Sequence, residues 1–563
     1  MSLNSTQKLS SGAFWAQLAR LLMLLFRDAA GAADLLAWVA DGPAQSAVVI
    51  LCPYRTFGAD NNFVFDEGAA MKLYKPDLGD EMMMLDLDGF DRQLPLVCDL
   101  DGTLIRSDTF HESFFEAFFH SPQHLLRTFP SWFKGRAALK ETLANVCSIE
   151  PRALPYRAEM LELMRGAKAD GREIYLVTAA DQSIADSIIC HLGGFAGAKG
   201  SDGSLNLKSR NKLKWLQASF PEGFIYAGDS AADLPIWEAA SGAVLVGNGV
   251  KYASQLRKAG VEVRAISPEN TNPVKDWLFE LRVHQWSKNV LIFVPLFLGH
   301  IAGDLHAVLR TIVAFVAFGL IASATYIIND LADLEADRAH ATKRFRAIAA
   351  GRISVINGFL ASIFMLGAGI GVALLLHPQF ALAVAAYLVL TLAYSFRLKR
   401  YALLDVTVIG ALFTLRIVMG QVLNDLAFSP WLLSFSAMFF FSLSLAKRHV
   451  EAMRACSKGR DAIKGRGYLP DDWPLTLGYG LASASASIVI MLLFIALEAR
   501  ATQEYHNPAW LYVAPAGVFM WLQRIWLLSH RMGLHDDPIV FALKDKTSLL
   551  IGAIIALAFA LAV

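Results

Sequence analysis

Three aspartates with helical spacing stand at the end of an apolar run that is long enough to cross a membrane. Residues 329–337 read Asn-Asp-Leu-Ala-Asp-Leu-Glu-Ala-Asp. This spacing places Asp330, Asp333 and Asp337 on one face of an α-helix, and Asn329 shares that face. Because carboxylates repel each other most strongly where hydrocarbon replaces water, a cation should lie between them. Oxygen ligands favour Mg²⁺, which commonly shares its site with substrate phosphates, so the motif predicts a Mg²⁺-diphosphate site at a membrane boundary.

A second set of acidic motifs lies in a stretch that reads as soluble and globular. Residues 96–103 are LVCDLDGT, an apolar run that ends in two alternating aspartates, and IYLVTAAD and FIYAGDSAADLPIW follow at 174–181 and 224–237. Each motif puts polar residues directly after a short apolar run. Strand patterns alternate here with helical ones, which predicts a parallel sheet of the doubly wound type.

The order of these motifs resembles that of the haloacid dehalogenase (HAD) phosphatase superfamily. The resemblance implies that Asp99 attacks phosphorus and that Asp101 protonates the departing oxygen and then activates water. It implies that Thr178 and Lys212 stabilise the transition state, with Lys208 as the alternative lysine. The long stretch between Asp99 and Thr178, which contains FHESFFEAFF, would form a helical cap.

The same resemblance implies one Mg²⁺ in this part of the chain. Its ligands would be Asp99, the backbone carbonyl of Asp101 and Asp229, while Asp233 would support the metal site. With the Asp-rich motif at 329–337, the sequence therefore predicts one Mg²⁺ in each half of the chain.

From about residue 285 onward, long apolar runs alternate with basic segments. They predict about nine membrane spans, near 286–302, 308–328, 355–376, 380–396, 403–423, 430–446, 475–497, 509–528 and 547–563. Lysine and arginine gather on one side of these spans, which predicts that the basic side and the Asp-rich motif face the cytosol and the C-terminus faces outward. We therefore expect a multi-pass protein of a bacterial-type inner membrane, with the HAD-like part on the cytoplasmic side.

Charged residues also occur within or directly after the apolar runs. Asp405 and Arg416 lie in the fifth predicted span, where charge is costly unless it faces a polar cavity. The loop after the sixth span, 447–466, carries seven cations against two anions, which fits a phosphate-binding wall. The alternative is that these cations face anionic lipid headgroups.

The motif NDLADLEADRAH, followed by KRFRAIAAG and YSFRLKR, resembles the UbiA superfamily of intramembrane prenyltransferases. The chain departs from the family pattern after the sixth span, where a basic loop stands in place of a second Asp-rich motif. RVHQWSKN, LAKRHVE and HDDPIVFALKDKTS resemble one branch, decaprenyl-phosphate phosphoribosyltransferase, which implies 5-phosphoribosyl diphosphate (PRPP) as donor and polyprenyl phosphate as acceptor.

Those two substrates carry more phosphates than one diphosphate, so further polar and basic residues are expected to bind them. The substrate-binding candidates are Lys288, Asn329, Lys343, Arg344, Tyr394, Lys399, Arg400, Lys447 and Arg448; the catalytic candidates are Asp330, Asp333 and Asp337. The HAD-like part would then remove the 5-phosphate and leave polyprenyl-phosphoryl ribose. The rival hypotheses are an aromatic-acceptor prenyltransferase of quinone biosynthesis with an accessory phosphatase, and a transporter or sensor with a phosphatase-like domain.

Composition sets the remaining limits. The 563 residues carry a net charge of +1, which gives no reason to expect nucleic acid as a partner. The five cysteines form no CxxC pair or metal-ligand spacing. The expected organisation is an N-terminal region at 1–90 of unassigned role, an α/β HAD-like domain at 91–265, a linker at 266–275 and an all-α membrane domain at 276–563. The sequence does not predict an oligomeric state.

Overall fold

The computed structural model describes residues 87–563 except 88, 134–135, 147–148, 203–205, 267–271, 458, 460–462, 464–465, 502–504 and 535–537. Residues 1–86 and 88 of the predicted N-terminal region and residues 267–271 of the predicted linker therefore lie outside the described residues. Everything described belongs to one compact unit, Ala70–Val563.

A parallel β-sheet forms the centre of the part between residues 87 and 266. Its strands are β1 (Leu96–Cys98), β2 (Ile174–Asp181), β3 (Gly197–Ser201), β4 (Ile225–Gly228), β5 (Gly242–Val246) and β6 (Val263–Ile266). They are ordered β3-β2-β1-β4-β5-β6 with every neighbouring pair parallel. The strand order reverses between β1 and β4, so two strands that are distant in sequence end side by side there. The parallel sheet expected from the alternating pattern is confirmed.

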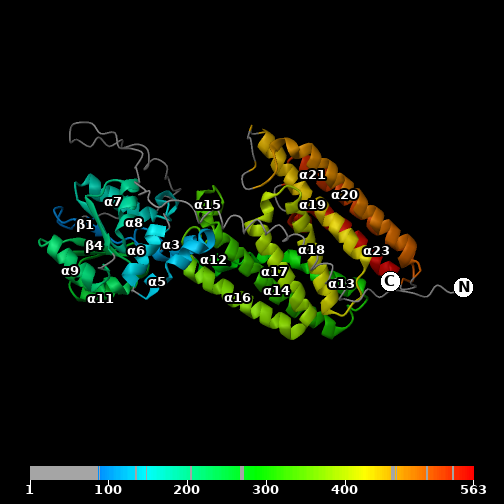
Figure 1. Cartoon of the computed structure of the whole chain (residues 1–563), viewed down its shortest axis with the longest axis horizontal. Helices are drawn as coiled ribbons and strands as arrows, with labels where there is room; N and C mark the ends of the chain where they lie inside the picture. Colours follow the sequence, from blue (N-terminus) through cyan, green and yellow to red (C-terminus); the bar gives the residue numbers. More distant parts are fainter. Residues whose placement is uncertain are drawn as a thin grey trace, which may run out of the picture. The chain divides into compact units, whose positions relative to one another are not determined.

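Helices cover both faces of this sheet, as Figure 1 shows. One face packs on α7 (Ala158–Ala169) and α8 (Gln182–Leu192), through side chains such as Met160 and Ile188. The other face packs on α9 (Arg210–Ser219), α10 (Leu234–Ala239) and α11 (Ala253–Lys258), with Trp237 fully buried. Because both faces are covered, β1, β4 and β5 consist of buried apolar residues.

Four further helices lie between β1 and α7, in the stretch where the sequence predicted a helical cap. They are α3 (Thr109–His120), α4 (Pro122–Arg127), α5 (Phe129–Trp132) and α6 (Arg136–Val146). Asp108 caps α3, because its side chain accepts hydrogen bonds from the Phe110 and His111 amides. These helices place side chains beside the carboxyl ends of β1 and β2.

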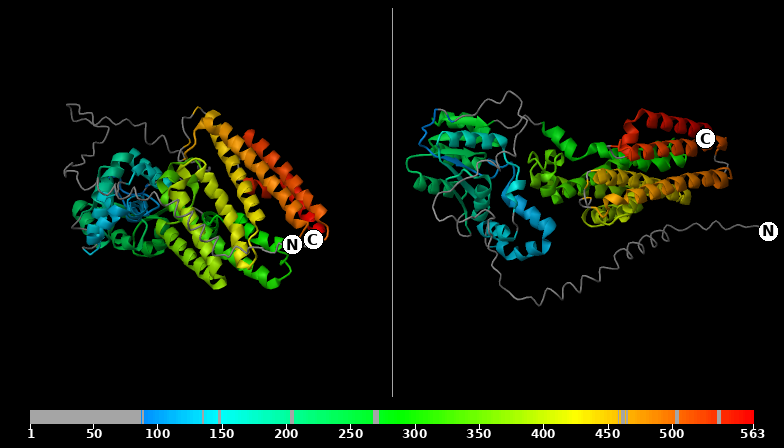
Figure 2. Two further views of the ribbon diagram at one scale, coloured as in Figure 1. Left: turned by 45° about the vertical axis from the view of Figure 1, so that its right-hand side comes forward. Right: turned by 90° about the horizontal axis from the view of Figure 1, so that it is seen from above.

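The part that follows is helical. In the described residues, seven helical segments are long and apolar enough to cross a membrane. Their main helices are α14 (Leu305–Ala332), α16 (Val355–Leu376), α17 (Pro378–Phe396), α18 (Leu404–Leu423), α19 (Pro430–Ser457), α20 (Trp473–Phe494) and α21 (Val513–His530). In the views of Figure 2 they form a bundle in which α14 packs on α16, and α19 packs on α18 and α20.

The expectation of nine comparable spans is corrected by this count. The run at 286–302 forms a 3₁₀ helix, η6 (Val283–Phe293), followed by the five-residue helix α13 (Val294–Leu298). Pro295 stands in the first turn of this helix, where its missing amide hydrogen is tolerated, and the helix ends at Leu298. The last predicted run corresponds to α23 (Lys546–Ala562), an apolar helix of 17 residues. Hydropathy locates the apolar runs, but it does not distinguish a long α-helix from a 3₁₀ helix or a shorter α-helix.

Candidate functional site

Three carboxylates meet at the carboxyl edge of the sheet, where the strand order reverses. Asp99 directly follows β1 and Asp229 directly follows β4, its neighbour in the sheet. Asp233 ends the next 3₁₀ turn, η4 (Ala231–Asp233). One ligand oxygen from each carboxylate lies within 4.8 Å of the others. Open parallel sheets bind ligands at this point in the strand order.

A buried lysine joins two of these carboxylates through a tyrosine. The Nζ atom of Lys212, on α9, lies 2.9 Å from Asp99 Oδ1 and donates a hydrogen bond of 3.0 Å to the hydroxyl of Tyr226. That hydroxyl donates to Asp233 Oδ1 at 2.9 Å. Burial alone would lower the pKa of Lys212, but Asp99 and Asp233 beside it leave that pKa raised. The lysine therefore stays charged, and Lys208, the alternative at this position, is not the residue paired with Asp99.

Asp101 follows β1 and Thr178 lies in β2, the strand next to β1. Asp101 Oδ1 accepts a hydrogen bond of 2.8 Å from the backbone amide of Thr109, the first residue of α3. Burial, with a smaller contribution from Asp108, raises the pKa of Asp101 to about 7. Thr178 is fully buried in β2, and its hydroxyl accepts from the Ala180 amide at 3.0 Å. Asp101 can therefore hold or release a proton near neutral pH.

The donor set at the sheet edge fits a divalent cation. Burial, and then the charge of Asp99, raises the pKa of Asp229 to about 7, so Asp229 is more costly to ionise here than in water. A divalent cation would offset this repulsion, and carboxylate oxygens are its preferred ligands. Gly102 provides the space: a Cβ atom there would lie 2.3 Å from Asp229 Oδ2, and the backbone φ of +75° also favours glycine.

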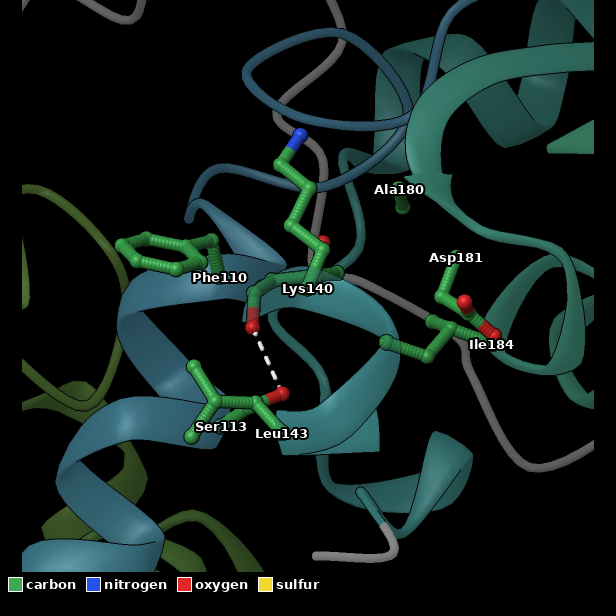
Figure 3. A pocket seen from close by; sticks show the side chains of 8 residues that line it. Phe110, Ser113, Lys140, Leu143, Ala180, Asp181 and Ile184 are labelled. Carbon is green, nitrogen blue, oxygen red and sulfur yellow. Dashed lines mark hydrogen bonds between the residues drawn. The ribbon is translucent and has the colours of Figure 1, made fainter. Parts of the chain in front are cut away.

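A small pocket lies next to this edge (Figure 3). Thr109, Phe110 and Ser113 of α3 line one side, Lys140 and Leu143 of α6 another, and Ala180, Asp181 and Ile184 the rest. Lys140 Nζ donates a hydrogen bond of 2.7 Å to the carbonyl of Ala179, beside Thr178. The helices between β1 and α7 therefore reach the same loops as the carboxylate cluster.

In the helical part, the Asp-rich motif is held by arginine and lysine side chains. Arg346 Nη1 bonds both Asp330 Oδ1, at 2.9 Å, and Asp337. Arg282 Nη2 lies 2.6 Å from both oxygens of Asp330, and Lys343 Nζ lies 3.2 Å from Asp337 Oδ1. Asp330 and Asp337 are 3 % and 1 % exposed, so these cations compensate carboxylates that water does not reach.

Asp333 has different partners because the helix is interrupted there. α14 ends at Ala332 and α15 (Leu334–Ala339) begins after Asp333, so the prediction of one continuous helical face is corrected. Asp333 is the residue between the two helices, and its side chain does not cap α15. Its Oδ2 accepts from Asn329 Nδ2 at 3.1 Å and lies 3.5 Å from Lys399 Nζ.

The other predicted substrate-binding residues divide into buried and exposed groups. Arg448 is buried and pairs with Glu451 at 2.7 Å, and Lys288 lies over the ring of Phe413. Tyr394 accepts a hydrogen bond of 2.6 Å from Arg466. Three predicted cations have exposed side chains: Arg344, Arg400 and Lys447.

Sequence reasoning did not single out two arginines that contact the motif, Arg282 and Arg346. Both lie in segments that carry the family resemblance, RVHQWSKN and KRFRAIAAG. Their place in these two motifs could have marked them as site residues. It also missed Tyr226, the tyrosine of FIYAGD, and Tyr468, whose hydroxyl donates to the buried Asp405 at 2.7 Å. The hydroxyl of Tyr226 within an apolar strand pattern could have identified it as a site residue. No feature of the sequence around Tyr468 predicts its contact with Asp405.

The Asp-rich motif also offers the oxygen ligands that Mg²⁺ takes, three carboxylates and the amide oxygen of Asn329. Four cationic side chains now neutralise the three carboxylates. A metal ion arriving with an anionic substrate would allow an exchange, in which the carboxylates hold the metal and the arginines and lysines hold phosphate. In the described residues these three carboxylates do not converge as those of Asp99, Asp229 and Asp233 do, so a metal ion would fit at the motif only after the carboxylates leave their cationic partners.

The comparisons with known proteins agree with this helical arrangement. Residues 291–543 match the model of the UbiA prenyltransferase family. The chain is 79% identical over 520 residues to the uncharacterized protein y4nM of Sinorhizobium fredii, covering 92% of this chain and 99% of that protein. It is 30% identical over 283 residues to the nodulation protein NoeC of Azorhizobium caulinodans, covering 49% and 91%. It is 31% identical over 290 residues to decaprenyl-phosphate phosphoribosyltransferase of Mycolicibacterium smegmatis, covering 49% and 88%.

The chain belongs to the UbiA prenyltransferase family. It is a membrane protein of that family with relatives that are named decaprenyl-phosphate phosphoribosyltransferase, and its sheet-containing part precedes the matched region.

Proposed function

We propose that the helical part transfers 5-phosphoribose from PRPP to a polyprenyl phosphate in the membrane. The observation that supports this most is the charge at the Asp-rich motif, where Arg282, Arg346, Lys343 and Lys399 surround three carboxylates. A prenyl diphosphate presents one diphosphate, whereas PRPP adds a 5-phosphate and the acceptor adds a lipid phosphate. The relatives named decaprenyl-phosphate phosphoribosyltransferase support a polyprenyl phosphate as acceptor and a phosphoribosyl group as the group transferred.

In this reaction the bond between the anomeric carbon and the diphosphate breaks, and an oxygen of the lipid phosphate takes its place on that carbon. The transition state resembles an oxocarbenium ion, as in other glycosyl transfers. Asp330, Asp333 and Asp337 would hold Mg²⁺, which neutralises a leaving diphosphate when it is bound. Arg282 and Arg346 would move from carboxylate to phosphate oxygens, because a guanidinium group binds both with similar geometry.

The sheet-containing part is proposed to hydrolyse a phosphomonoester, with the 5-phosphate of the lipid product as its substrate. A carboxylate oxygen of Asp99 attacks phosphorus, the ester bond breaks, and Asp101 gives its proton to the departing oxygen. Asp101 then takes a proton from the water that cleaves the aspartyl phosphate. Lys212 and Thr178 would stabilise the phosphoryl oxygens, and Asp99, Asp101 and Asp229 would hold Mg²⁺ with support from Asp233.

Both reactions in one chain would make consecutive steps efficient, because the second site stays near the first product. The final product would be polyprenyl-phosphoryl ribose, a lipid-linked pentose donor for envelope glycans. Both sites would face the cytosol, where PRPP is made.

A comparison of two labelled donors, given separately, distinguishes this proposal from its rivals. Purified protein in vesicles that contain polyprenyl phosphate receives either ¹⁴C-labelled PRPP or a ¹⁴C-labelled prenyl diphosphate with an aromatic acceptor. We expect label from PRPP to enter the lipid fraction in wild type and not in Asp330→Asn. Transfer of label from the prenyl diphosphate alone would refute the proposal, and transfer of neither label would favour the transporter or sensor hypothesis.

A further inference from the structure

The exposed apolar side chains of the sheet-containing part are confined to one segment. Among its described residues, the large hydrophobic side chains that are exposed are Phe118, Leu126, Phe129 and Phe133, at 42 %, 76 %, 55 % and 80 %. All four fall within 16 residues that run from the end of α3 through α4 and α5 to the residue after α5, Phe133. Single exposed apolar residues are ordinary, but their confinement to one segment marks an interaction surface.

The segment has the composition of a membrane-interface contact. Rings of Phe129 and Phe133 meet edge to face with centroids 5.4 Å apart, so they form one apolar cluster. Arg127, between the exposed Leu126 and Phe129, is also exposed. Aromatic rings beside cations are typical of surfaces that enter the headgroup region of a bilayer and bind its anionic lipids.

The helical part of the chain indicates that the partner of this exposed surface is a lipid bilayer. Seven helical segments of the same chain are long and apolar enough to span a membrane, so the chain itself would bring membrane lipid into reach. The end of α3 contacts one of these helices directly: the ring of Phe118 lies 6.1 Å from that of Phe359, near the beginning of α16. Beside Phe359 on α16, Leu360 and Phe364 are 57 % and 74 % exposed, as expected for side chains that face lipid.

We propose that the segment formed by residues 118–133 inserts its exposed aromatic edge into the surface of the membrane that holds the helical part. This contact rests on the exposed residues and not on the proposed phosphatase reaction. If that reaction occurs, the contact has a consequence for it: α3, whose Thr109 amide bonds Asp101, would be held at the surface of the membrane that contains the lipid substrate.

Photo-crosslinking in the full-length protein tests the contact without relying on catalysis. The photoreactive amino acid p-benzoylphenylalanine replaces Leu126, Phe129 or Phe133, one at a time, and the control replaces Gln255, an exposed residue of α11. Each protein is reconstituted in vesicles of phosphatidylcholine and radiolabelled phosphatidylglycerol and then irradiated. Replacing exposed side chains leaves the core intact, and an unchanged midpoint of thermal unfolding verifies this.

We expect labelled lipid to attach several-fold more at the three segment positions than at Gln255. Attachment at the same level at all four positions would overturn the proposal. So would a crosslinked band of twice the mass at Phe129 or Phe133, since it would identify a second copy of the chain as the occupant. Hydrolysis of p-nitrophenyl phosphate by the same proteins reports separately on the proposed phosphatase, so loss of that activity and loss of lipid contact can be distinguished.

Discussion

Arg346→Gln is the substitution that most directly probes how the Asp-rich motif is held together. Arg346 is the one side chain among the described residues that contacts both Asp330 and Asp337, whose side chains are 4 % and 2 % exposed. Removing one partner of a buried ion pair costs about 3–5 kcal/mol, because the remaining charge is left without compensation. Arg282 still binds Asp330, and the Arg346 side chain is itself 22 % exposed, so we expect the lower end, about 3 kcal/mol.

Thermal unfolding of the purified protein in detergent measures this loss of stability. Two further variants serve as a control and as a rescue. Arg344→Gln removes a cation of the same type two residues away, but Arg344 is exposed and stacks on Phe345, so stability should change by less than about 0.5 kcal/mol. Adding Asp337→Asn to Arg346→Gln removes a buried carboxylate that would otherwise keep Lys343 as its cationic partner, and it should restore about 1 kcal/mol of stability.

Transfer from PRPP should not recover in that double variant, because Asp337 is also a proposed metal ligand. Recovery of stability without recovery of transfer would separate the folding role of the pair from its role with substrate. The reasoning is refuted if Arg346→Gln unfolds at the same temperature as wild type, or if Arg344→Gln and Arg346→Gln are equally destabilised.

Three other outcomes concern the sheet edge. Asp99→Asn should abolish phosphate release from p-nitrophenyl phosphate yet leave transfer from PRPP intact, measured in parallel on one preparation; loss of both activities would contradict the assignment. Phosphatase turnover should fall as pH rises above about 7, because Asp101, whose pKa is raised to about 7, loses the proton that it gives to the leaving oxygen, and a rate that keeps rising to pH 9 would exclude this role. Gly102→Ala should lower phosphatase activity and weaken Mg²⁺ binding, measured by calorimetry, since its Cβ would meet Asp229 at 2.3 Å; unchanged binding would show that Asp229 does not need that space.

The sheet edge was the more predictable of the two sites. Asp99 and Asp229 each follow a short apolar run, and parallel strands place their carboxyl ends on one edge of the sheet. Their approach therefore follows from topology, which the alternation of strands and helices predicted. The pairing of Lys212 with Asp99 depended on the resemblance, and the hydroxyl of Tyr226 between Lys212 and Asp233 required the structure.

The helical part was predictable in composition and less so in geometry. Apolar runs located the long helices, yet the apolar run at 286–302 forms a 3₁₀ helix and a short α-helix. The partners of the Asp-rich motif come from elsewhere in the chain: Arg282 lies 48 residues before Asp330 and Arg346 lies 16 residues after it. Helical spacing predicts which residues share a face of one helix. The contacts of Arg282 and Arg346 with the motif depend on the tertiary fold, which spacing does not predict.

Mass spectrometry of lipids made from PRPP tests the central claim most directly. Vesicles that contain the protein, a polyprenyl phosphate and Mg²⁺ are incubated with PRPP, and the masses of the extracted lipids are measured. The wild-type protein should produce polyprenyl-phosphoryl ribose, Asp99→Asn should accumulate the same lipid with its 5-phosphate, and Asp330→Asn should produce neither. A wild-type reaction that leaves the polyprenyl phosphate without any pentose, while PRPP and Mg²⁺ are present, would contradict the account.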